Sequence, residues 1–407
     1  MKCGLLGRSL GHSYSPQIHS FFGDYSYELL EKEPQEVEHF LRSGDFTGLN
    51  VTIPYKKTVI PFLDEMTPLA QRLGCVNTVV RKNGKLLGHN TDYAGFLSLV
   101  NRSGLSPAGK KCLVLGSGGA SNTAVAVLQD LGAHVVVISR TGENHYENLH
   151  LHADASILVN TTPVGMYPDT GLSPVSLEHF PHLEGVLDVI YNPARTGLLL
   201  EAERRGLVAE NGLWMLVAQA KAAAEYFLDR AISEEMVDSV YHTLRRSMEN
   251  IILIGMPGCG KSTIGQLLAE KSGKIFVDSD AEIEKWAKKS IPAIFAEDGE
   301  AVFRNWETQV LNHWCKRSGL VIATGGGCVT RAENAWLLRQ NGRVFWLQRD
   351  LNQLSTNGRP LSESQGVQAL YAKRQGLYSQ FADRTIENYG RPQEAADAIW
   401  EEFTCGF

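Results

Sequence analysis

The stretch Ile251–Thr263, IILI followed by GMPGCGKST, decides the fold of the second half of this chain. From Gly255 onward it matches the pattern G-x-x-x-x-G-K-[ST]. In that pattern backbone amides surround phosphates, the lysine reaches the terminal phosphates and the hydroxyl holds Mg²⁺. An apolar run precedes the loop and a helical pattern, Ile264–Lys271, follows it, so we predict a P-loop between a strand and a helix. A P-loop does not name the phosphate acceptor, because ATPases, GTPases and small kinases share it.

A second glycine loop, Gly116–Ser121 (GSGGAS), follows the apolar run Cys112–Leu115. It has no lysine, and it has small residues where backbone must approach a pyrophosphate at the start of a helix. Both features are typical of a dinucleotide-binding loop. The two loops cannot serve the same nucleotide. The sequence therefore predicts one half that carries out redox chemistry and one half that transfers phosphate.

Length and composition indicate a soluble protein of two or three domains. The chain has 407 residues, 43% of them hydrophobic and 21% charged, and domains average roughly 150 residues. A formal net charge of -6, without a basic run that contains aromatics, argues against nucleic acid as a partner. The seven cysteines form no C-x-x-C pair, which favours a reducing compartment over a disulfide framework or a structural zinc. Because we find neither a secretory stretch nor a segment of roughly 18 apolar residues, we expect a cytoplasmic protein without a membrane partner.

Strand-like runs alternate with helical ones through most of the chain, which predicts an α/β fold with parallel sheets covered by helices. The expected strands are 111–115, 133–139, 156–160, 185–190, 250–254, 320–323 and 343–347. Residues 213–246 are expected to be mainly helical, and a short joint leads from them into the strand before the P-loop. We therefore expect a fusion boundary near Met248, between residues 1–247 and 248–407.

Small polar motifs are dense before the dinucleotide loop. Ser13 and Ser15 lie at i and i+2, so their hydroxyls face the same side if that segment is extended. Hydroxyls, amides, a lysine and a carboxylate recur in Asn50–Lys56, Gly74–Thr78 and Gly88–Asp92. Such groups suit a polyhydroxylated acid, which needs many hydrogen bonds and few fixed charges. Taken singly, each motif also fits a loop, a turn, a helix cap or a solvated lysine.

In order and spacing, these segments resemble shikimate dehydrogenase over Met1 to about Arg246. The matching motifs are LLGxSLxHSxSPxIH at Leu5–His19, NVTIPYK at Asn50–Lys56, VNTV at Val76–Val79, NTD at Asn90–Asp92, NTTPVGM at Asn160–Met166, DVIYNP at Asp188–Pro193 and MLVAQA at Met215–Ala220. So many matches in one order form a specific signal, whereas the glycine loop alone is a weak one. The resemblance implies a two-lobed dehydrogenase, with an α/β substrate lobe of about 1–97 plus 219–247 and a Rossmann-like NADP lobe of about 98–218.

The resemblance further implies NADPH-dependent reduction of the 3-keto group of 3-dehydroshikimate to shikimate. Lys56 and Asp92 would lie at the reacting carbon. Hydride transfer to a ketone leaves alkoxide charge, which an ammonium can stabilise or protonate while a carboxylate orients that ammonium. Whether Lys56 donates the proton or only holds the oxygen is left open. The residues expected to bind the substrate carboxylate or ring oxygens are Ser13, Ser15, Tyr191, Thr52, Asn77, Asn90 and Gln219.

Cofactor choice depends on the end of the strand that follows the dinucleotide loop. An NAD enzyme usually has Asp or Glu about 20 residues after the loop. Arg140 stands at that strand end here, beside two hydroxyl residues. This favours the 2′-phosphate of NADP, with a solvated arginine at a strand end as the alternative. The residues expected to contact NADP(H) are Gly116, Gly118, Gly119, Ala120, Ser139, Arg140 and Thr141.

Further motifs follow the P-loop. They are FVDSD at Phe276–Asp280, GExxFRxxE at Gly299–Glu307, ATGGG at Ala323–Gly327, GRPL at Gly358–Leu361 and YAKR at Tyr371–Arg374, the last expected to begin a final basic helix. Their order resembles shikimate kinase over about 250–407. Without that resemblance, Asp278 and Asp280 also fit a turn at a strand end, and Arg374 fits a charge on a helix surface.

The second resemblance implies phosphorylation of shikimate to shikimate 3-phosphate with ATP and Mg²⁺. Ser262 and Asp278 would hold Mg²⁺, and Asp280 would orient or deprotonate the 3-hydroxyl. Lys261 and a lid arginine would stabilise phosphoryl charge. The residues expected to bind ATP are Gly258, Cys259, Gly260, Lys261, Ser262, Thr263 and Arg359. Those expected to bind shikimate are Asp280, Arg304, Gly325, Gly326, Gly327 and Arg374.

The chain is thus expected to be a bifunctional shikimate-pathway enzyme. One alternative is that one half is degenerate and senses a ligand for the other, which the intact Lys56, Asp92, Lys261 and Asp280 argue against. A second alternative keeps both folds and changes the substrates, to quinate oxidation with NAD or to another small-alcohol kinase. Arg140 and the arginine pair, Arg304 and Arg374, argue against that one.

Overall fold

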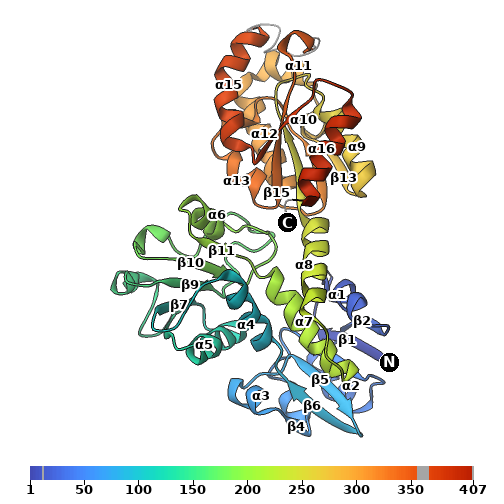
Figure 1. Ribbon diagram of the computed structural model, residues 1–407, viewed down its shortest axis with the longest axis vertical. Coiled ribbons are helices and arrows are strands. Elements are labelled where there is room, and N and C mark those ends of the chain that lie inside the picture. The colour runs from blue at the N-terminus through green and yellow to red at the C-terminus, as the bar shows by residue number, and fades with distance from the viewer. Residues whose placement is uncertain (12, 355–365, 406–407) are drawn as a thin grey trace. The chain divides into compact units, whose positions relative to one another are not determined.

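The computed structural model describes residues 1–11, 13–354 and 366–405 (Figure 1). The chain divides into two compact units. Unit 1 comprises Met1–Val164, Pro174–Tyr191 and Glu201–Thr243, and unit 2 comprises Gly165–Ser173, Asn192–Leu200 and Leu244–Phe407. The fusion boundary near Met248 and the two lobes of the first half stay predictions. No helix in the described part of the chain is long and apolar enough to span a bilayer.

The first sheet of unit 1 has six strands in the order β2-β1-β3-β5-β6-β4. They are β1 (Lys2–Gly7), β2 (Ser26–Glu31), β3 (Gly48–Val51), β4 (Glu65–Met66), β5 (Thr78–Lys82) and β6 (Lys85–His89). β1 is parallel to both of its neighbours, whereas β5 is antiparallel to β3 and β6. The connecting helices are α1 (Ser15–Phe22), η1 (Pro34–Glu36), α2 (Val37–Ser43), η2 (Ile60–Phe62) and α3 (Pro68–Leu73). Leu6, Leu49 and Val79 anchor a buried core on this sheet.

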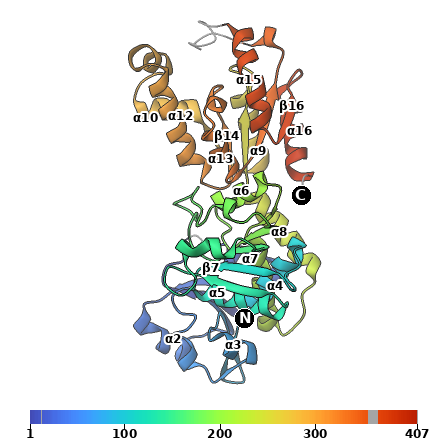
Figure 2. The ribbon, with the colours of Figure 1, turned by 90° about the vertical axis from the view of Figure 1, so that its left-hand side faces the viewer.

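The second sheet of unit 1 is fully parallel, in the order β11-β10-β9-β7-β8. Its strands are β7 (Lys111–Leu115), β8 (His134–Ile138), β9 (Ile157–Asn160), β10 (Gly185–Asp188) and β11 (Val208–Glu210). The helices between Asp92 and Met248 are α4 (Asp92–Ser103), α5 (Gly119–Asp130), η3 (Tyr146–His152), η4 (Leu177–His179), α6 (Gly197–Arg204), α7 (Leu213–Leu228) and α8 (Glu234–Met248). Part of α6 and the last turn of α8 belong to unit 2. α4 and α7 lie side by side (Figures 1 and 2).

The sheet of unit 2 is also parallel, in the order β13-β14-β12-β15-β16. Its strands are β12 (Asn250–Ile254), β13 (Ile275–Asp278), β14 (Leu320–Ala323), β15 (Gly342–Gln348) and β16 (Arg384–Glu387). The helices are α9 (Lys261–Ser272), α10 (Ser279–Ala287), α11 (Ile291–Ala293), η5 (Ile294–Asp298), α12 (Glu300–Cys315), η6 (Cys328–Thr330), α13 (Asn334–Arg339), η7 (Leu351–Gln353), α15 (Val367–Phe381) and α16 (Pro392–Cys405). In Figure 1, α12, α13 and α15 lie on one side of this sheet, and α9 and α16 lie side by side on the other.

The predicted α/β fold with parallel sheets is confirmed, and each expected strand is present with ends that agree within a few residues. One prediction about a helix was wrong. Tyr371–Arg374 does not begin the final helix: it lies inside α15, which starts at Val367, and α16 follows. The reason is that β16 and a turn interrupt the helical pattern before Pro392 opens a new helix.

Parallel topology brings the phosphate-binding loops to one edge of each of the two fully parallel sheets. The carboxyl ends of parallel strands lie together, and ligands bind there. In unit 2 the P-loop follows β12, Asp278 ends β13, the glycines at 325–327 follow β14 and Arg349 follows β15. In unit 1 the dinucleotide loop follows β7, and Arg140 comes two residues after β8.

Candidate active sites

A cavity of about 300 Å³ in unit 1 brings together most residues predicted to bind the first substrate. We name it the Lys56 cavity. The predicted residues in its lining are Ser13, Ser15, Thr52, Lys56, Asn77, Asp92, Tyr191 and Gln219, together with Ala120 of the dinucleotide loop. Sequence segments from one end of unit 1 to the other therefore meet at one place. A cavity that binds one polar molecule requires such a convergence of polar side chains.

Lys56 and Asp92 form an ion pair in this cavity. The Lys56 Nζ lies 2.6 Å from the Asp92 Oδ2, and the two side chains are 27% and 13% exposed. Asp92 is in the first turn of α4, where the helix dipole favours a carboxylate. The carboxylate therefore holds the ammonium in a partly buried place, ready to donate a hydrogen bond to an oxygen in the cavity.

The two serine hydroxyls are adjacent, although the segment that carries them is a turn and not the extended segment considered from the sequence. Tyr14 has helical backbone angles, φ -79° and ψ -4°, and precedes α1. The Ser13 hydroxyl accepts a hydrogen bond from the Ser15 amide at 3.2 Å and lies 3.1 Å from the Ser15 hydroxyl. A turn, not a strand, thus brings both hydroxyls to the start of a helix, where free amides favour an anion.

Buried amides form the wall behind the Lys56 cavity. The Asn77 Oδ1 accepts a hydrogen bond from the Thr91 amide at 2.7 Å, and the Thr91 hydroxyl lies 3.4 Å from the Gln219 Oε1. Asn50 also lines the cavity, and sequence reasoning did not single it out. The Tyr27 hydroxyl donates to the Asn50 Oδ1 at 2.7 Å. The position of Asn50 in the motif NVTIPYK was the one available signal.

Asn90 is the predicted residue that the structure does not bring into the lining of this cavity. Its amide nitrogen lies 3.2 Å from the Cys75 carbonyl oxygen and 3.0 Å from the Cys75 Sγ. Its amide oxygen accepts a hydrogen bond from the Tyr93 amide at 3.2 Å, in the first turn of α4. In this arrangement Asn90 supports the loop and helix that carry Asp92, and its role as a ligand stays a prediction.

The dinucleotide loop opens α5 with its backbone uncovered. A Cβ built on Gly118 or on Gly119 would meet no atom within 4 Å. Gly116 has a φ of 105°, which favours glycine, and its carbonyl oxygen accepts the Ser121 hydroxyl at 2.7 Å. An open glycine backbone at a helix start fits a pyrophosphate. The residues present therefore fit a dinucleotide cofactor.

Ser139, Arg140 and Thr141 come together at the end of β8. The Ser139 hydroxyl donates to the Thr141 carbonyl oxygen, and Arg140 is exposed. Positive charge from Arg140 lowers the pKa of Tyr146, although burial raises it overall. An exposed guanidinium beside a strand end can reach a phosphate on the ribose of a dinucleotide.

A second cavity, of about 460 Å³, lies in unit 2, and we name it the P-loop cavity. The predicted residues in its lining are Gly258, Gly260, Lys261, Ser262, Thr263, Asp278, Asp280, Arg304, Gly325, Gly326, Gly327 and Arg374. Cys259 is fully buried and is not in the lining. Arg359 lies outside the described residues. Glu307 and Arg349 also line the cavity.

The P-loop is held in shape by its own lysine and by a neighbouring strand end. The Lys261 ammonium donates to the carbonyl oxygens of Gly255 and Met256, each at 2.9 Å. Asn388, after β16, donates to the Cys259 carbonyl oxygen at 2.7 Å. Gly260 has a φ of 97° and precedes α9, so the amides that follow it open toward the cavity.

Ser262 and Asp278 meet as the Mg²⁺ prediction requires. The Ser262 hydroxyl donates to the Asp278 Oδ2 at 2.5 Å. The Asp278 Oδ1 accepts from the Asp280 amide at 3.0 Å, because Asp278 is the N-cap of α10. A hydroxyl and a carboxylate oxygen are the ligand types that Mg²⁺ prefers beside substrate phosphates. The residues present therefore fit this cation.

Asp280 and Glu307 present carboxylate oxygens to the same glycine. A Cβ on Gly325 would lie 2.6 Å from the Glu307 Oε1 and 2.7 Å from the Asp280 Oδ1. Burial, with the negative charges of Glu307 and Asp278, raises the pKa of Asp280 to about 7. Burial likewise raises the pKa of Glu307. A carboxylate in this state is suited to accept a proton near neutral pH.

Arg304 is fixed by two glutamates and stacked on a glycine. Its Nη1 donates to the Glu307 Oε2 at 2.8 Å, and its Nη2 donates to the Glu300 Oε1 at 3.1 Å. A Cβ on Gly327 would lie 2.2 Å from its terminal nitrogens. Arg374 donates from its Nη1 to the Gly326 carbonyl oxygen at 3.2 Å. Two guanidinium groups thus flank the glycine turn, as recognition of a carboxylate requires.

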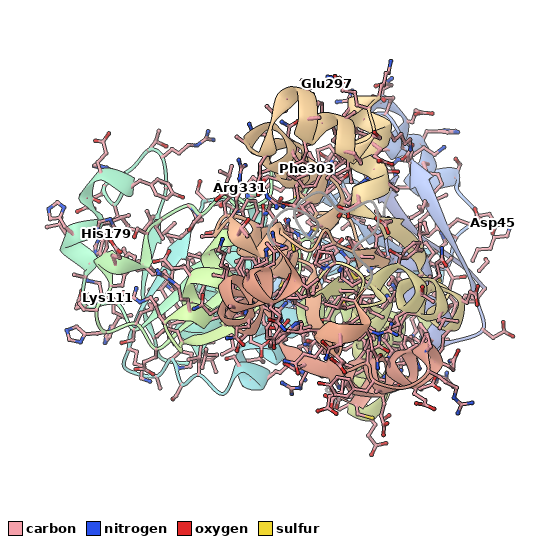
Figure 3. All side chains as sticks on the ribbon, turned by 90° about the horizontal axis from the view of Figure 1, so that it is seen from above. Asp45, Lys111, His179, Glu297, Phe303 and Arg331 are labelled. Carbon is pink, nitrogen blue, oxygen red and sulfur yellow. The ribbon has the colours of Figure 1, made fainter. Side chains whose placement is uncertain are left out.

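Aromatic side chains also line this cavity. Phe303 is buried, lines the cavity and packs against Phe295, with ring centroids 4.8 Å apart. Figure 3 labels Phe303, which belongs to α12, and Glu297, which belongs to η5. The Arg304 guanidinium lies over the Phe303 ring, 5.1 Å from its centroid. Apolar surface beside charged groups suits a ring that has a carboxylate at one end.

These two sites define the class of protein: an α/β enzyme that joins a dinucleotide-dependent oxidoreductase to a P-loop phosphotransferase. The family model for the shikimate dehydrogenase substrate binding domain matches residues 5–79, and the model for shikimate kinase matches residues 257–404. A curated shikimate dehydrogenase (NADP(+)) from Syntrophomonas wolfei is 37% identical over 257 residues, which cover 55% of this chain and 88% of that protein.

Solved structures agree with this relationship. Shikimate dehydrogenase 1 from Peptoclostridium difficile is 35% identical with a TM-score of 0.55, over 60% of this chain and 97% of its own. A shikimate 5-dehydrogenase from Thermus thermophilus, solved with NADP(H) and shikimate, is 31% identical with a TM-score of 0.54, over 60% and 99%. This chain belongs to the shikimate dehydrogenase family and carries a shikimate kinase domain in the same polypeptide. It is a bifunctional enzyme of the shikimate pathway.

Proposed function

We propose that unit 1 reduces 3-dehydroshikimate to shikimate with NADPH, and that unit 2 phosphorylates the 3-hydroxyl of shikimate with ATP and Mg²⁺. The observation that supports this most is the pairing of two intact catalytic constellations. Lys56 and Asp92 lie 2.6 Å apart in one cavity. A P-loop lysine, Asp280 and two arginines line the other.

In the reduction, NADPH bound on the dinucleotide loop would supply the hydride. The Lys56 ammonium would donate a hydrogen bond to the substrate keto oxygen, and Asp92 would hold that ammonium in place. The alkoxide that hydride transfer leaves would take its proton from this ammonium or from water. Ser13 and Ser15 would bind the substrate carboxylate, because their hydroxyls lie at the start of α1. The partial burial of the ion pair limits water around the oxygen on which charge develops.

In the phosphorylation, ATP bound at the P-loop would supply the phosphoryl group. Asp280 would accept the proton of the 3-hydroxyl, for which a pKa of about 7 is suitable. Ser262 and Asp278 would hold Mg²⁺. Arg304 and Arg374 would bind the shikimate carboxylate and so fix the ring relative to Asp280. The role of Arg359 rests on the sequence alone.

The first test follows both reactions in one cuvette that contains 3-dehydroshikimate, NADPH, Mg²⁺ and ATP. Nicotinamide absorbance reports reduction, and mass detection of shikimate 3-phosphate reports phosphorylation. We expect Lys56→Ala to lower the reduction rate by about 100- to 10,000-fold, while phosphorylation of added shikimate continues. We expect Lys261→Ala to abolish phosphorylation and to leave reduction intact.

Lys57→Ala is the matched control, since Lys57 is exposed and adjacent to Lys56. It should leave both rates unchanged. If either catalytic substitution stopped both steps in a folded protein, the two sites would not be independent. Faster oxidation of NADH than of NADPH would contradict the assignment to Arg140. A wild-type protein that performs one step only would support a degenerate half with a sensing role.

A further inference from the structure

Arg349 is a wall residue of the P-loop cavity that the sequence motifs did not assign. It is the first residue after β15, which pairs with the P-loop strand β12. The Asn388 amide donates to the Gln348 carbonyl oxygen at 2.8 Å, directly before Arg349. The backbone of Arg349 therefore has a fixed position at the carboxyl edge of the sheet, beside the loop that Asn388 also supports.

The guanidinium of Arg349 has no anionic partner in the described part of the chain. No described carboxylate lies within 4.0 Å of it, and its buried Nε has no hydrogen-bond partner there. The other two arginines of this cavity differ, because Arg304 pairs with two glutamates and Arg374 donates to a carbonyl oxygen. A half-buried cation without a partner is unfavourable unless a ligand supplies the negative charge.

The position of this cation indicates which ligand that is. The Arg349 Nη1 lies 4.0 Å from where a Cβ on Gly260 would stand. Gly260 is the residue before α9, so its neighbourhood contains the helix-start amides that bind phosphate. The carboxylate-binding arginines belong instead to the glycine turn, where Arg304 stacks on Gly327 and Arg374 contacts Gly326.

We propose that Arg349 binds the phosphate chain of the nucleotide in the P-loop cavity, as a second cation besides Lys261. The inference rests on the proposed kinase function of unit 2. Planar guanidinium groups bind phosphate oxygens through two parallel hydrogen bonds, which an ammonium cannot do. Arg349 is therefore a nucleotide-binding residue that directly follows β15.

Direct binding to the full-length protein tests this proposal. We expect Arg349→Ala to weaken ADP binding, measured by calorimetry, by about 10- to 100-fold, the range for a hydrogen bond between charged groups. Arg349→Lys should retain part of the affinity. The dissociation constant for shikimate should not change, because Arg349 lies away from the glycine turn. The Arg349→Ala variant should lose affinity for tripolyphosphate to the same extent as for ADP. It should bind adenosine as tightly as the wild-type protein does.

Arg384→Ala is the matched control, since Arg384 lies on the neighbouring strand β16 and is exposed in an ion pair with Glu402. It should leave ADP affinity unchanged, and the dehydrogenase rate should be normal in every variant. An unchanged ADP affinity in Arg349→Ala would overturn the proposal. So would an equal loss for adenosine, which would indicate contact with the base. A wild-type protein that binds no ADP would instead overturn the kinase function itself.

Discussion

Gly327 is a residue at which any side chain larger than a hydrogen atom would clash with the kinase site. A Cβ at this position would lie 2.2 Å from the terminal nitrogens of Arg304. Arg304 cannot move aside easily, because Glu300 and Glu307 hold its guanidinium. We therefore expect Gly327→Ala to displace this guanidinium and to raise the KM for shikimate by about 10-fold or more, which steady-state kinetics would measure.

Gly376→Ala supplies the control at the same scale. Gly376 is exposed inside α15, and a Cβ there would meet no atom within 4 Å. Alanine in an exposed helix interior is favoured by about 0.5–1 kcal/mol over glycine. This variant should keep the wild-type KM and be slightly more stable. An unchanged KM in Gly327→Ala would mean that the Arg304 guanidinium does not contact shikimate.

At the scale of elements, Asp278 serves two structures at once. One carboxylate oxygen caps α10 and the other accepts the Ser262 hydroxyl. We expect Asp278→Ala to destabilise α10 locally by about 1 kcal/mol, the usual cost of losing a cap. Asp278→Asn should retain the cap, because an asparagine oxygen also accepts hydrogen bonds from helix-start amides. Hydrogen exchange of peptides from α10 would measure the difference.

The same two variants separate capping from metal binding. Both remove the negative charge, so both should raise the Mg²⁺ concentration needed for half-maximal kinase activity. Thr67→Ala is a control for the loss of a cap, since Thr67 accepts from the Ala70 amide at the start of α3. It should affect exchange in α3 and leave Mg²⁺ dependence unchanged. Normal Mg²⁺ dependence in Asp278→Asn would contradict the assignment of Asp278 as a ligand.

At the scale of the whole molecule, two buried histidines make unit 1 sensitive to acid. Burial lowers the pKa of His19 to about 3 and that of His89 to about 4. A histidine in the unfolded chain has a pKa near 6.5. In the pH range between the folded pKa and 6.5, the unfolded chain therefore binds more protons than the folded one. The contribution of these neutral histidines to the free energy of unfolding is thus fully present above pH 6.5 and is lost as the pH falls. For each histidine, the free energy of unfolding of unit 1 should fall by about 2 kcal/mol between pH 7 and pH 5.

Hydrogen exchange at pH 7 and pH 5, compared after correction for intrinsic exchange rates, would measure this loss in peptides of unit 1. A single melting temperature would not, because a chain of two units need not unfold in one step. His39→Gln is the control, since His39 is exposed. Equal stability of the β1 and β5 peptides at the two pH values would contradict the prediction.

Much of the fold could be predicted because it depends on local patterns. Apolar runs that each precede a glycine loop identified β7 and β12 with the helices that follow them. The site residues came instead from motif order, since hydroxyls and amides alone fit any loop. Contacts that arise from packing could not be predicted. The burial of Asn90 against Cys75 and the approach of Arg349 to Gly260 depend on neighbours far away in sequence.

By itself, the sequence determined the class of this protein, because two phosphate-binding loops are written in consecutive residues and need only a strand and a helix around them. It also determined the family, through motifs in a specific order. Only the tertiary structure decided which charges are compensated. Asp280 and Glu307 share one glycine, and Arg349 has no anionic partner among the described residues. The physical reason is that burial and charge pairing depend on distance in space, which residue order does not specify.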